Sequence, residues 1–190
     1  QFVIPPPDKV NRPAAARGGD LAAVSDAKSG FRSMFAGRSD ARRGKLLESG
    51  GGTRESENAV DSGLQWLKKH QHPSGNWSLD RFHHVDGCQG RCGDQGCGTP
   101  SDTAATGLAL LPFLGRGYTH RGKVYNKLVR SALTWIIADQ TANGSFGSIG
   151  SGNMYAHAQA TIALCEALSM TGDTRLLLKP ATAAVAYIVD

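Results

Sequence analysis

The spacing of apolar residues predicts that the second part of the chain is entirely helical. In 56–70 and 124–139 the apolar residues share one helical face and the charges lie opposite, which is typical of half-buried helices. In 101–115 and 156–170 nearly every position is apolar, so these helices need cover on all sides. The two kinds alternate, and 180–190 begins another half-buried helix. This order predicts an all-α array of two-helix units with buried inner and amphipathic outer helices.

Residues 1–56 lack this periodicity and are predicted to form a flexible basic linker that is mostly disordered. Proline, glycine and charged residues dominate it, and the pattern leaves room only for short helices near 31–35 or 42–47. An electrostatic tether to acidic lipid or polymer is the alternative role. The folded region is predicted to span 57–190. Because its last helix is cut short, we expect the chain to be a piece of a longer protein.

The net charge of +5 comes mainly from the predicted linker. Residues 1–56 hold ten lysines and arginines against six acids, whereas 57–190 hold eleven against ten. A nearly neutral folded region argues against a nucleic-acid surface. No apolar run reaches the roughly 18 residues of a transmembrane helix, and the first residues lack a signal-peptide pattern. The compartment stays open, with export or membrane tethering of a longer parent protein among the options.

Two stretches repeat one pattern without a gap. GLQWLKKHQHPSGNW (63–77) aligns with ALTWIIADQTANGSF (132–146), and AVAYIVD (184–190) begins a third copy. The shared positions are Trp66 with Trp135, Gln71 with Gln140, Gly75 with Gly144, and Trp77 with Phe146. Glycine supplies the positive φ of a helix exit, and the aromatic ring covers the junction. The glutamine amide is predicted to satisfy the last carbonyls of its helix or the amides of the next. These residues are therefore predicted to be structural.

This Gln-x-x-x-Gly-x-Trp/Phe pattern resembles the QW repeat of squalene cyclase and other terpenoid cyclases, whose fold the protein prenyltransferase beta subunits share. More narrowly, 101–120 and 154–168 resemble large bacterial repeat proteins of this superfamily. The resemblance covers about 57–190 and implies a partial α/α toroid of about two and a half repeats. The remaining repeats of the parent chain, or an oligomer partner, are then expected to cover its apolar edges.

The catalytic motifs of these families are only partly present. The cyclase motif Asp-x-Asp-Asp-Thr-Ala corresponds to TPSDTA (99–104), where Asp102 matches but Ser101 replaces the central proton-donating acid. Class II cyclase chemistry is therefore not expected. His157 resembles the zinc-binding histidine of the prenyltransferases, so the resemblance makes Asp102 and His157 the candidate catalytic residues. A shifted zinc site would add Cys97 to them.

Structural roles compete for the same residues. Thr99 as N-cap and Asp102 three residues later form a capping-box pattern, and His157 is equally suited to a bond at a helix start. Gln159 and Glu166 lie seven residues apart on one face of an inner helix. We expect this face to bind a ligand in the cavity or to meet a partner. A buried glutamate there needs a bonding partner.

The loop GCQGRCGDQGCG (87–98) carries three of the four cysteines. The candidate metal ligands are Cys88, Cys92, Cys97, His83 and His84. Three or four soft ligands in so short a stretch are typical of structural zinc, although the paired Cys-x2-Cys spacing is missing. A disulfide from Cys97 to Cys88 or Cys92, or free thiols, are the alternatives. Residues 92–95 also resemble the Cys-Gly-Glu-Gln thioester of complement and macroglobulin proteins, with Asp94 in place of the glutamate.

Two functions follow from this reading. The first is a non-catalytic repeat module that binds a peptide, a protein or an apolar small molecule in its cavity or at its mouth. The alternative is an enzyme acting on an isoprenoid or other apolar substrate, similar to the prenyltransferases and possessing a zinc ion. The fold alone does not choose between them.

Overall fold

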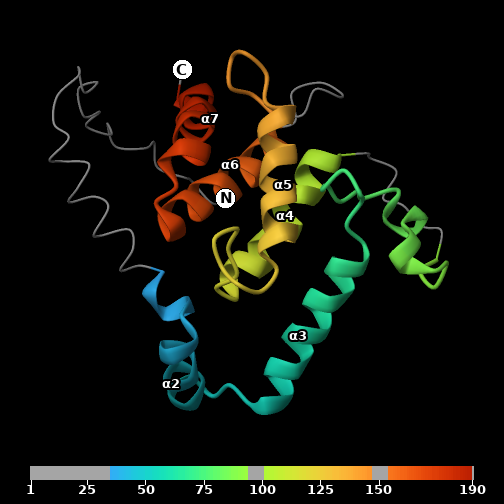
Figure 1. Cartoon of the computed structure of the whole chain (residues 1–190), viewed down its shortest axis with the longest axis vertical. Coiled ribbons are helices and arrows are strands. Elements are labelled where there is room, and N and C mark those ends of the chain that lie inside the picture. The colour runs from blue at the N-terminus through green and yellow to red at the C-terminus, as the bar shows by residue number, and fades with distance from the viewer. Residues whose placement is uncertain (1–34, 94–100, 147–153, 190) are drawn as a thin grey trace, which may run out of the picture.

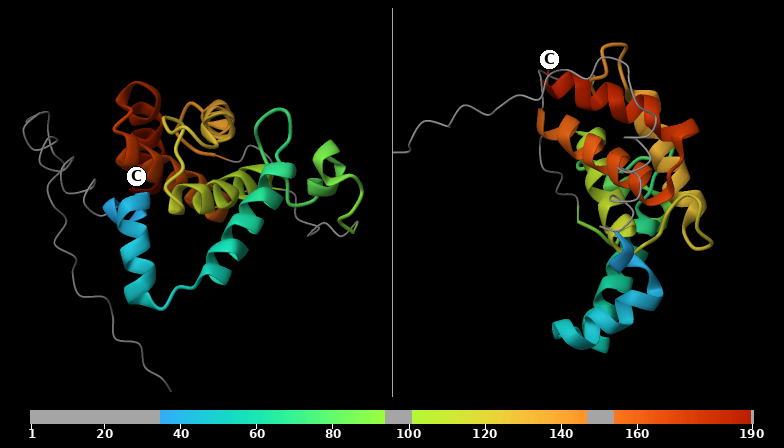
Figure 2. Two further views of the ribbon diagram at one scale, coloured as in Figure 1. Left: turned by 60° about the horizontal axis from the view of Figure 1, so that its bottom comes forward. Right: turned by 90° about the vertical axis from the view of Figure 1, so that its left-hand side faces the viewer.

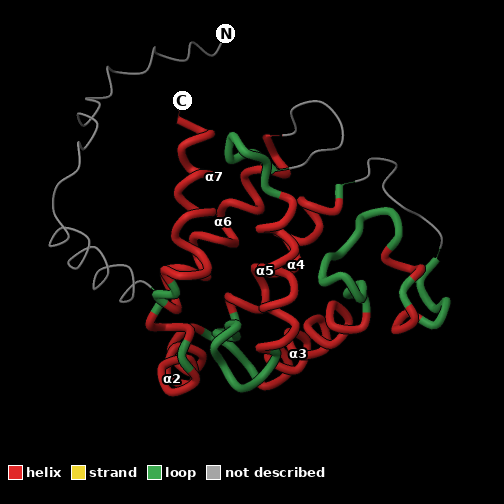
Figure 3. Tube along the Cα trace, turned by 45° about the horizontal axis from the view of Figure 1, so that its top comes forward, coloured by secondary structure: helices red, strands yellow, loops and turns green. Residues whose placement is uncertain are grey.

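The computed structural model describes residues 35–93, 101–146 and 154–189 (Figure 1). Within these ranges every regular element is a helix (Figure 3), which confirms the all-α prediction. None of the helices described is long and apolar enough to cross a membrane. The elements are η1 (Ala36–Arg38), α2 (Asp40–Gly50), α3 (Arg54–Lys69), η2 (Phe82–His84), η3 (Asp86–Cys88), α4 (Asp102–Gly115), α5 (Asn126–Asp139), α6 (Met154–Thr171), the π-helical turn η4 (Thr174–Leu178) and α7 (Lys179–Val189).

Helices α4 and α6 form the centre of the molecule and pack along one another (Figure 2). Gly107 permits their close approach, because a Cβ at this position would lie 2.7 Å from the carbonyl carbon of Gln159 and 2.8 Å from the nitrogen of Ala160. Helices α3 and α5 pack against α4, and α7 packs against α6. The predicted alternation therefore corresponds to an inner pair, α4 and α6, with α3, α5 and α7 around it.

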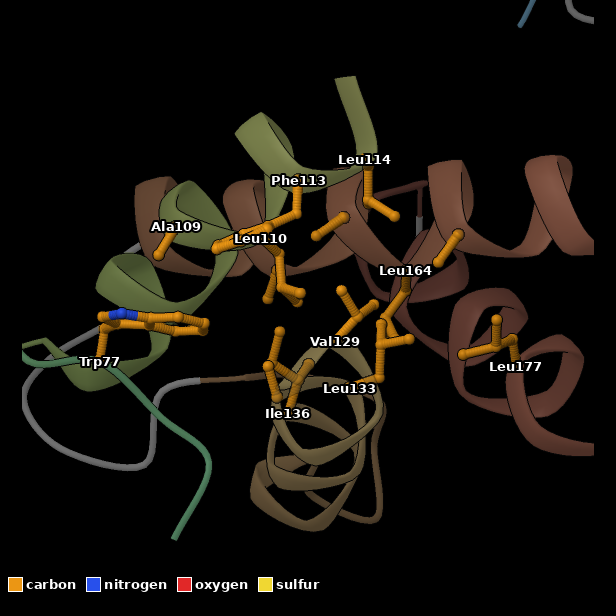
Figure 4. Close-up of a cluster of buried hydrophobic side chains, with 14 of the residues drawn as sticks. Trp77, Ala109, Leu110, Phe113, Leu114, Val129, Leu133, Ile136, Leu164 and Leu177 are labelled. Carbon is orange, nitrogen blue, oxygen red and sulfur yellow. The ribbon is translucent and has the colours of Figure 1, made fainter. Parts of the chain in front are cut away.

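The core lies between α4, α5 and α6, whose large apolar side chains point toward one another (Figure 4). Its fully buried members include Leu110, Leu114, Leu133, Ile136 and Leu164. Trp77, from the turn after α3, closes one side and lies with its ring centroid 6.2 Å from that of Phe113. Each buried leucine or phenylalanine contributes about 1.5–3 kcal/mol relative to an exposed one, so this core determines how the helices are placed.

The inner helices are not covered on every side, which corrects one prediction from the pattern. Leu108 of α4 is 38% exposed and Ile162 of α6 is 44% exposed. On α7, Val185 and Ile188 are also exposed. The residues that the structure describes do not supply the cover that these apolar positions require, so apolar edges remain on the surface as the sequence predicted.

Helices α3 and α5 end in the same kind of turn. Gly75 and Gly144 have the predicted left-handed backbone, with φ values of +101° and +90°. They lie in the turn after each helix rather than at its exit, because the C-caps are His70 and Gln140, whose φ values are negative. A Cβ on Gly75 would also lie 2.7 Å from the carbonyl oxygen of Ser131 in α5. The aromatic residues that follow, Trp77 and Phe146, are buried. The turn therefore requires glycine both for its backbone conformation and for its contact with the next outer helix.

The glutamine of each turn bonds differently from the prediction. The Gln71 amide donates to the carbonyls of Gly75 (2.8 Å) and Leu128 (3.1 Å), and the Gln140 amide donates to those of Gly144 (3.0 Å) and Pro180 (2.9 Å). The acceptors are thus the turn itself and the first turn of the next outer helix, rather than the last carbonyls of the glutamine's own helix. The amide reaches across because the turn packs on that neighbouring helix.

Residues 35–56, which we predicted to belong to a disordered linker, are largely helical. Helices α2 and α3 form the two arms of a V below the other helices (Figure 1). The Arg38 guanidinium donates to Glu166 of α6 at 2.7 Å, and Arg43 donates twice to Glu57 of α3 at 2.8 and 3.0 Å. The short helix allowed near 42–47 lies within α2, but the sequence pattern did not indicate the remaining order, because ion pairs to distant residues, rather than apolar periodicity, place this segment. Residues 1–34 lie outside the described part.

A buried acid holds the turn between α6 and α7. Asp173 accepts hydrogen bonds from His120 (3.0 Å) and Arg121 (3.2 Å) through one carboxylate oxygen. Through the other oxygen it accepts from the backbone N–H of Leu176, which caps η4. The hydrogen bond from His120 lowers the pKa of Asp173 most, and Arg121 adds to the effect against the opposing effect of burial.

The stability of the chain should therefore fall in acid, in part through Asp173. Because its pKa is lower in the folded than in the unfolded chain, its contribution is complete above the unfolded pKa and is lost as the pH falls below it. Between pH 5 and pH 3, the free energy of unfolding measured in urea is expected to fall less for Asp173→Asn than for the unaltered chain. Equal losses in the two proteins would show that this carboxylate does not contribute.

Candidate metal centre

Three potential metal ligands from two segments converge beside the end of α3. They are His70, the residue that ends α3, Cys88 at the end of η3, and Cys92 four residues later. One ligand atom from each lies within 4.8 Å of the other two. His70 and Cys88 are each only 3% exposed, whereas Cys92 is partly buried. The group of three can hold one metal ion.

The cysteine loop reaches α3 through two local features. Gly87 lies directly against the backbone carbonyl of Lys69, where a side chain would collide. Beyond Cys88, Gln89 and Gly90 adopt positive φ values of 54° and 66° and reverse the chain. The Arg91 N–H donates to the Cys88 carbonyl at 3.2 Å, which closes the turn. The reversal returns Cys92 to the side of Cys88.

The His70 ring has its tautomer fixed by a backbone bond. Its Nδ1 lies 2.6 Å from the carbonyl oxygen of Trp66, which can only accept, so Nδ1 carries the proton. The other ring nitrogen, Nε2, lies 3.3 Å from the Cys92 sulfur. The ring also stacks on Trp66, with centroids 3.9 Å apart. Trp66 is 44% exposed, unlike its repeat partner Trp135, which packs on the core. A metal-binding histidine needs this arrangement, with one nitrogen donating to a fixed acceptor and the other free.

The two thiols have different acidities. Burial by itself would raise the pKa of Cys88, but hydrogen bonding to the Cys92 N–H, the His70 ring and the Cys92 thiol lowers it to about 7. The pKa of Cys92 is raised, first by burial and then by its hydrogen bond with Cys88. The lowered pKa of Cys88 favours its thiolate, which is the form that binds metals. Binding of an ion to both sulfurs would release protons.

The ligand set overlaps only in part with the predicted one. Cys88 and Cys92 are free thiols and belong to the group, whereas Cys97 lies outside the described residues, as do Asp94 and Gln95 of the thioester-like stretch. Among the residues described, His83 and His84 are not in the group. They lie in η2 with their rings edge to face, 4.1 Å apart.

The sequence reading missed His70. The signal lay in the spacing of Trp66 and His70, which are four residues apart and therefore share a face at the end of a predicted helix. The separation of 18 residues from Cys88 hid the histidine, because zinc-site patterns are recognised by short spacings. In the folded chain, Gly87 lies against Lys69 at the end of α3, and this contact brings Cys88 close to His70.

Asp102 serves the start of α4. The N-cap is Ser101, whose hydroxyl accepts from the Ala104 N–H at 3.2 Å, so the predicted capping box with Thr99 as N-cap is wrong. Thr99 itself is outside the described part. The Asp102 carboxylate accepts from the Asn76 amide at 3.0 Å and from Arg81 at 2.9 Å. These bonds hold the turn after α3 to the start of α4.

His157 and its neighbours on α6 are also engaged in bonds within the fold. The ring of His157 accepts the Phe146 N–H through Nδ1 at 3.2 Å, and its Nε2 lies 3.0 Å from the Ala184 carbonyl. Both ring nitrogens are thus committed to the backbone of α7 and of the turn after α5. Glu166 has Arg38 as the partner that the sequence required, while the backbone of Gln159 packs against Gly107.

Comparison with known proteins gave no match: no protein-family model, curated protein or solved structure is significantly similar to this chain. The resemblance to the QW-repeat proteins therefore stays a prediction from the sequence. What the chain does has to be inferred from the residues and distances described above.

Proposed function

We propose that this chain is a non-catalytic α/α-toroid repeat module that binds apolar side chains of a peptide or protein. The observation that carries the toroid proposal is the repetition of tertiary contacts. The Gln71 amide donates to Leu128 and the Gln140 amide donates to Pro180; the two acceptors are 52 positions apart, and the two glutamines are 69 positions apart. In the sequence repeat, Tyr187 aligns with Trp135, and these two residues are also 52 positions apart. Successive outer helices are therefore joined by the same kind of contact, as expected for a stack of two-helix units.

The absence of catalysis is supported by the bonds of the candidate catalytic residues. Asp102 is paired with Arg81 and bonded to Asn76. His157 has both ring nitrogens directed at backbone groups. A general acid or a metal ligand needs an available proton or lone pair facing a substrate. In this chain both residues hold helices together instead.

An apolar groove is the proposed binding surface. It has a volume of about 330 Å³ and lies between the end of α3, the turn that follows it and the open side of α4. Its lining includes Trp66, Leu67, Trp77, Leu79, Phe82, Leu108 and Pro112. Aromatic walls around one exposed leucine are typical of grooves that accept apolar side chains.

Selection from a random peptide library tests this function. Peptides that bind are expected to carry apolar residues at helical spacing and to lose at least about tenfold in affinity with Leu108→Asp, because the aspartate must be desolvated in the groove. Val185→Asp is the matched control, since Val185 is comparably exposed but lies on α7 and does not line this groove. Failure to select such peptides, or equal losses in both variants, would contradict the proposal.

We further propose that the metal held by His70, Cys88 and Cys92 is zinc. One imidazole and two thiolates form a soft ligand set that suits tetrahedral zinc. The ion would clip the loop that carries η2 and η3 onto the end of α3. Purified protein is expected to contain about one zinc per chain by elemental analysis.

The same centre is the one feature among the described residues that favours an enzyme. Zinc sites with three protein ligands and one open position are typical of catalysis, whereas structural sites have four. An activity on isoprenoid substrates would then depend on His70 and the two cysteines rather than on Asp102 and His157. Turnover of farnesyl diphosphate that is lost with His70→Ala would support this second function over the first.

A further inference from the structure

A cavity of about 250 Å³ opens directly beside the three metal ligands. The ligands themselves form one wall, Trp66 forms another, and Lys69 and Arg91 complete the lining together with Gly87 and Gln89. Among the residues that the structure describes, no acidic residue lines this cavity. Within the described part of the chain, no carboxylate forms an ion pair with Lys69 or Arg91.

The charge balance of this cavity favours an anion. A divalent ion bound by two thiolates and a neutral imidazole has no net charge, so no described acid or ligand compensates the two side-chain cations. Lys69 and Arg91 come from different segments, the last turn of α3 and the reversal before Cys92. Two cationic residues that line one concave site raise the local concentration of anions.

The coordination chemistry of the proposed zinc ion also favours an anion at this site. The three described ligands leave one position of a tetrahedral zinc for another donor. We propose that a small monoanion, such as a carboxylate, occupies this position and is held by Lys69 and Arg91. This inference rests on the proposed zinc centre and adds the class of ligand that the centre accepts.

Cobalt substitution of the full chain provides the test, with azide as the anionic probe. Co²⁺ bound by two cysteines and a histidine absorbs visibly, and azide is expected to shift this spectrum in a saturable way. Lys69→Met and Arg91→Met are each expected to weaken azide binding by about fivefold, the effect of one water-screened unit charge near contact distance. Lys68→Met is the matched control, because Lys68 is the preceding residue of α3 and does not line the cavity. It should leave azide affinity unchanged.

The possible failures are distinguishable. If Co²⁺ gives no spectrum that depends on Cys88, the zinc proposal itself fails. If Co²⁺ binds but azide changes nothing in either the unaltered chain or Cys97→Ser, the anion site is refuted while the zinc centre stands. If azide acts only in Cys97→Ser, Cys97 is the fourth ligand and the anion site is again refuted. Azide binding that is equal in all three lysine and arginine variants would overturn the role of Lys69 and Arg91.

Discussion

Replacing Cys88 with serine is expected to reduce bound zinc from about one per chain to below about one tenth. Cys88 is the buried member of the thiol pair, and it supplies the more acidic sulfur. Serine keeps the size of the side chain but does not provide a thiolate, which zinc prefers. Removal of an ion present at a thousand times its dissociation constant lowers the free energy of unfolding by about 4 kcal/mol. Elemental analysis and thermal unfolding, each with and without added zinc, measure the two effects.

Two matched variants isolate the centre from the other candidates. Cys165→Ser removes a thiol of α6 that is outside the group of ligands, and its zinc content is expected to stay unchanged. His157→Gln removes the histidine that the family resemblance favoured, and it too should keep zinc, since both ring nitrogens bond the backbone. Zinc that is lost with His157→Gln but kept with Cys88→Ser would reverse the assignment of the metal centre.

Gly107→Ala is expected to destabilise the fold by about 3 kcal/mol, at the upper end of the usual range for overpacking. The added methyl group would lie 2.7–2.8 Å from backbone atoms of Gln159 and Ala160. Backbone cannot rotate away as a side chain does, so α4 and α6 must separate along their contact. Urea unfolding followed by circular dichroism gives the change in free energy directly.

Gly63→Ala is the control for the loss of glycine in a helix. Gly63 lies inside α3, and a Cβ there meets nothing within 4 Å. This substitution is expected to stabilise the chain by about 0.5–1 kcal/mol, because alanine favours helix and loses less backbone entropy on folding. If Gly107→Ala stabilised the protein in the same way, the tight contact between α4 and α6 would not exist.

The sequence was most informative where periodicity is strong. The apolar spacing of 101–115 and 156–170 predicted two buried helices, and α4 and α6 are the central pair. The repeat of Gly75 and Gly144 predicted two left-handed glycines after the outer helices, and both have positive φ, although in the following turn rather than at the helix exit. Such features depend on residues close in sequence, where spacing along the chain determines geometry directly.

Contacts between distant segments could not be read in this way. Arg38 and Glu166 are 128 residues apart, and neither position carries a local pattern that indicates its partner. Ion pairs and single hydrogen bonds have no periodicity, so the segment from 35 to 56 resembled a linker although it packs on α3 and α6.

The sequence by itself determined the helical class, the order of inner and outer helices, the glycine turns and the two cysteines of the candidate centre. Only the tertiary structure decided that His70 completes that centre. It also decided that Asp102 and His157 form hydrogen bonds that connect elements of the fold. The physical reason is that a metal site is defined by directions and distances among a few atoms. Those directions are set by the docking of one loop on the end of α3, which depends on Gly87 and on the packing of the whole core.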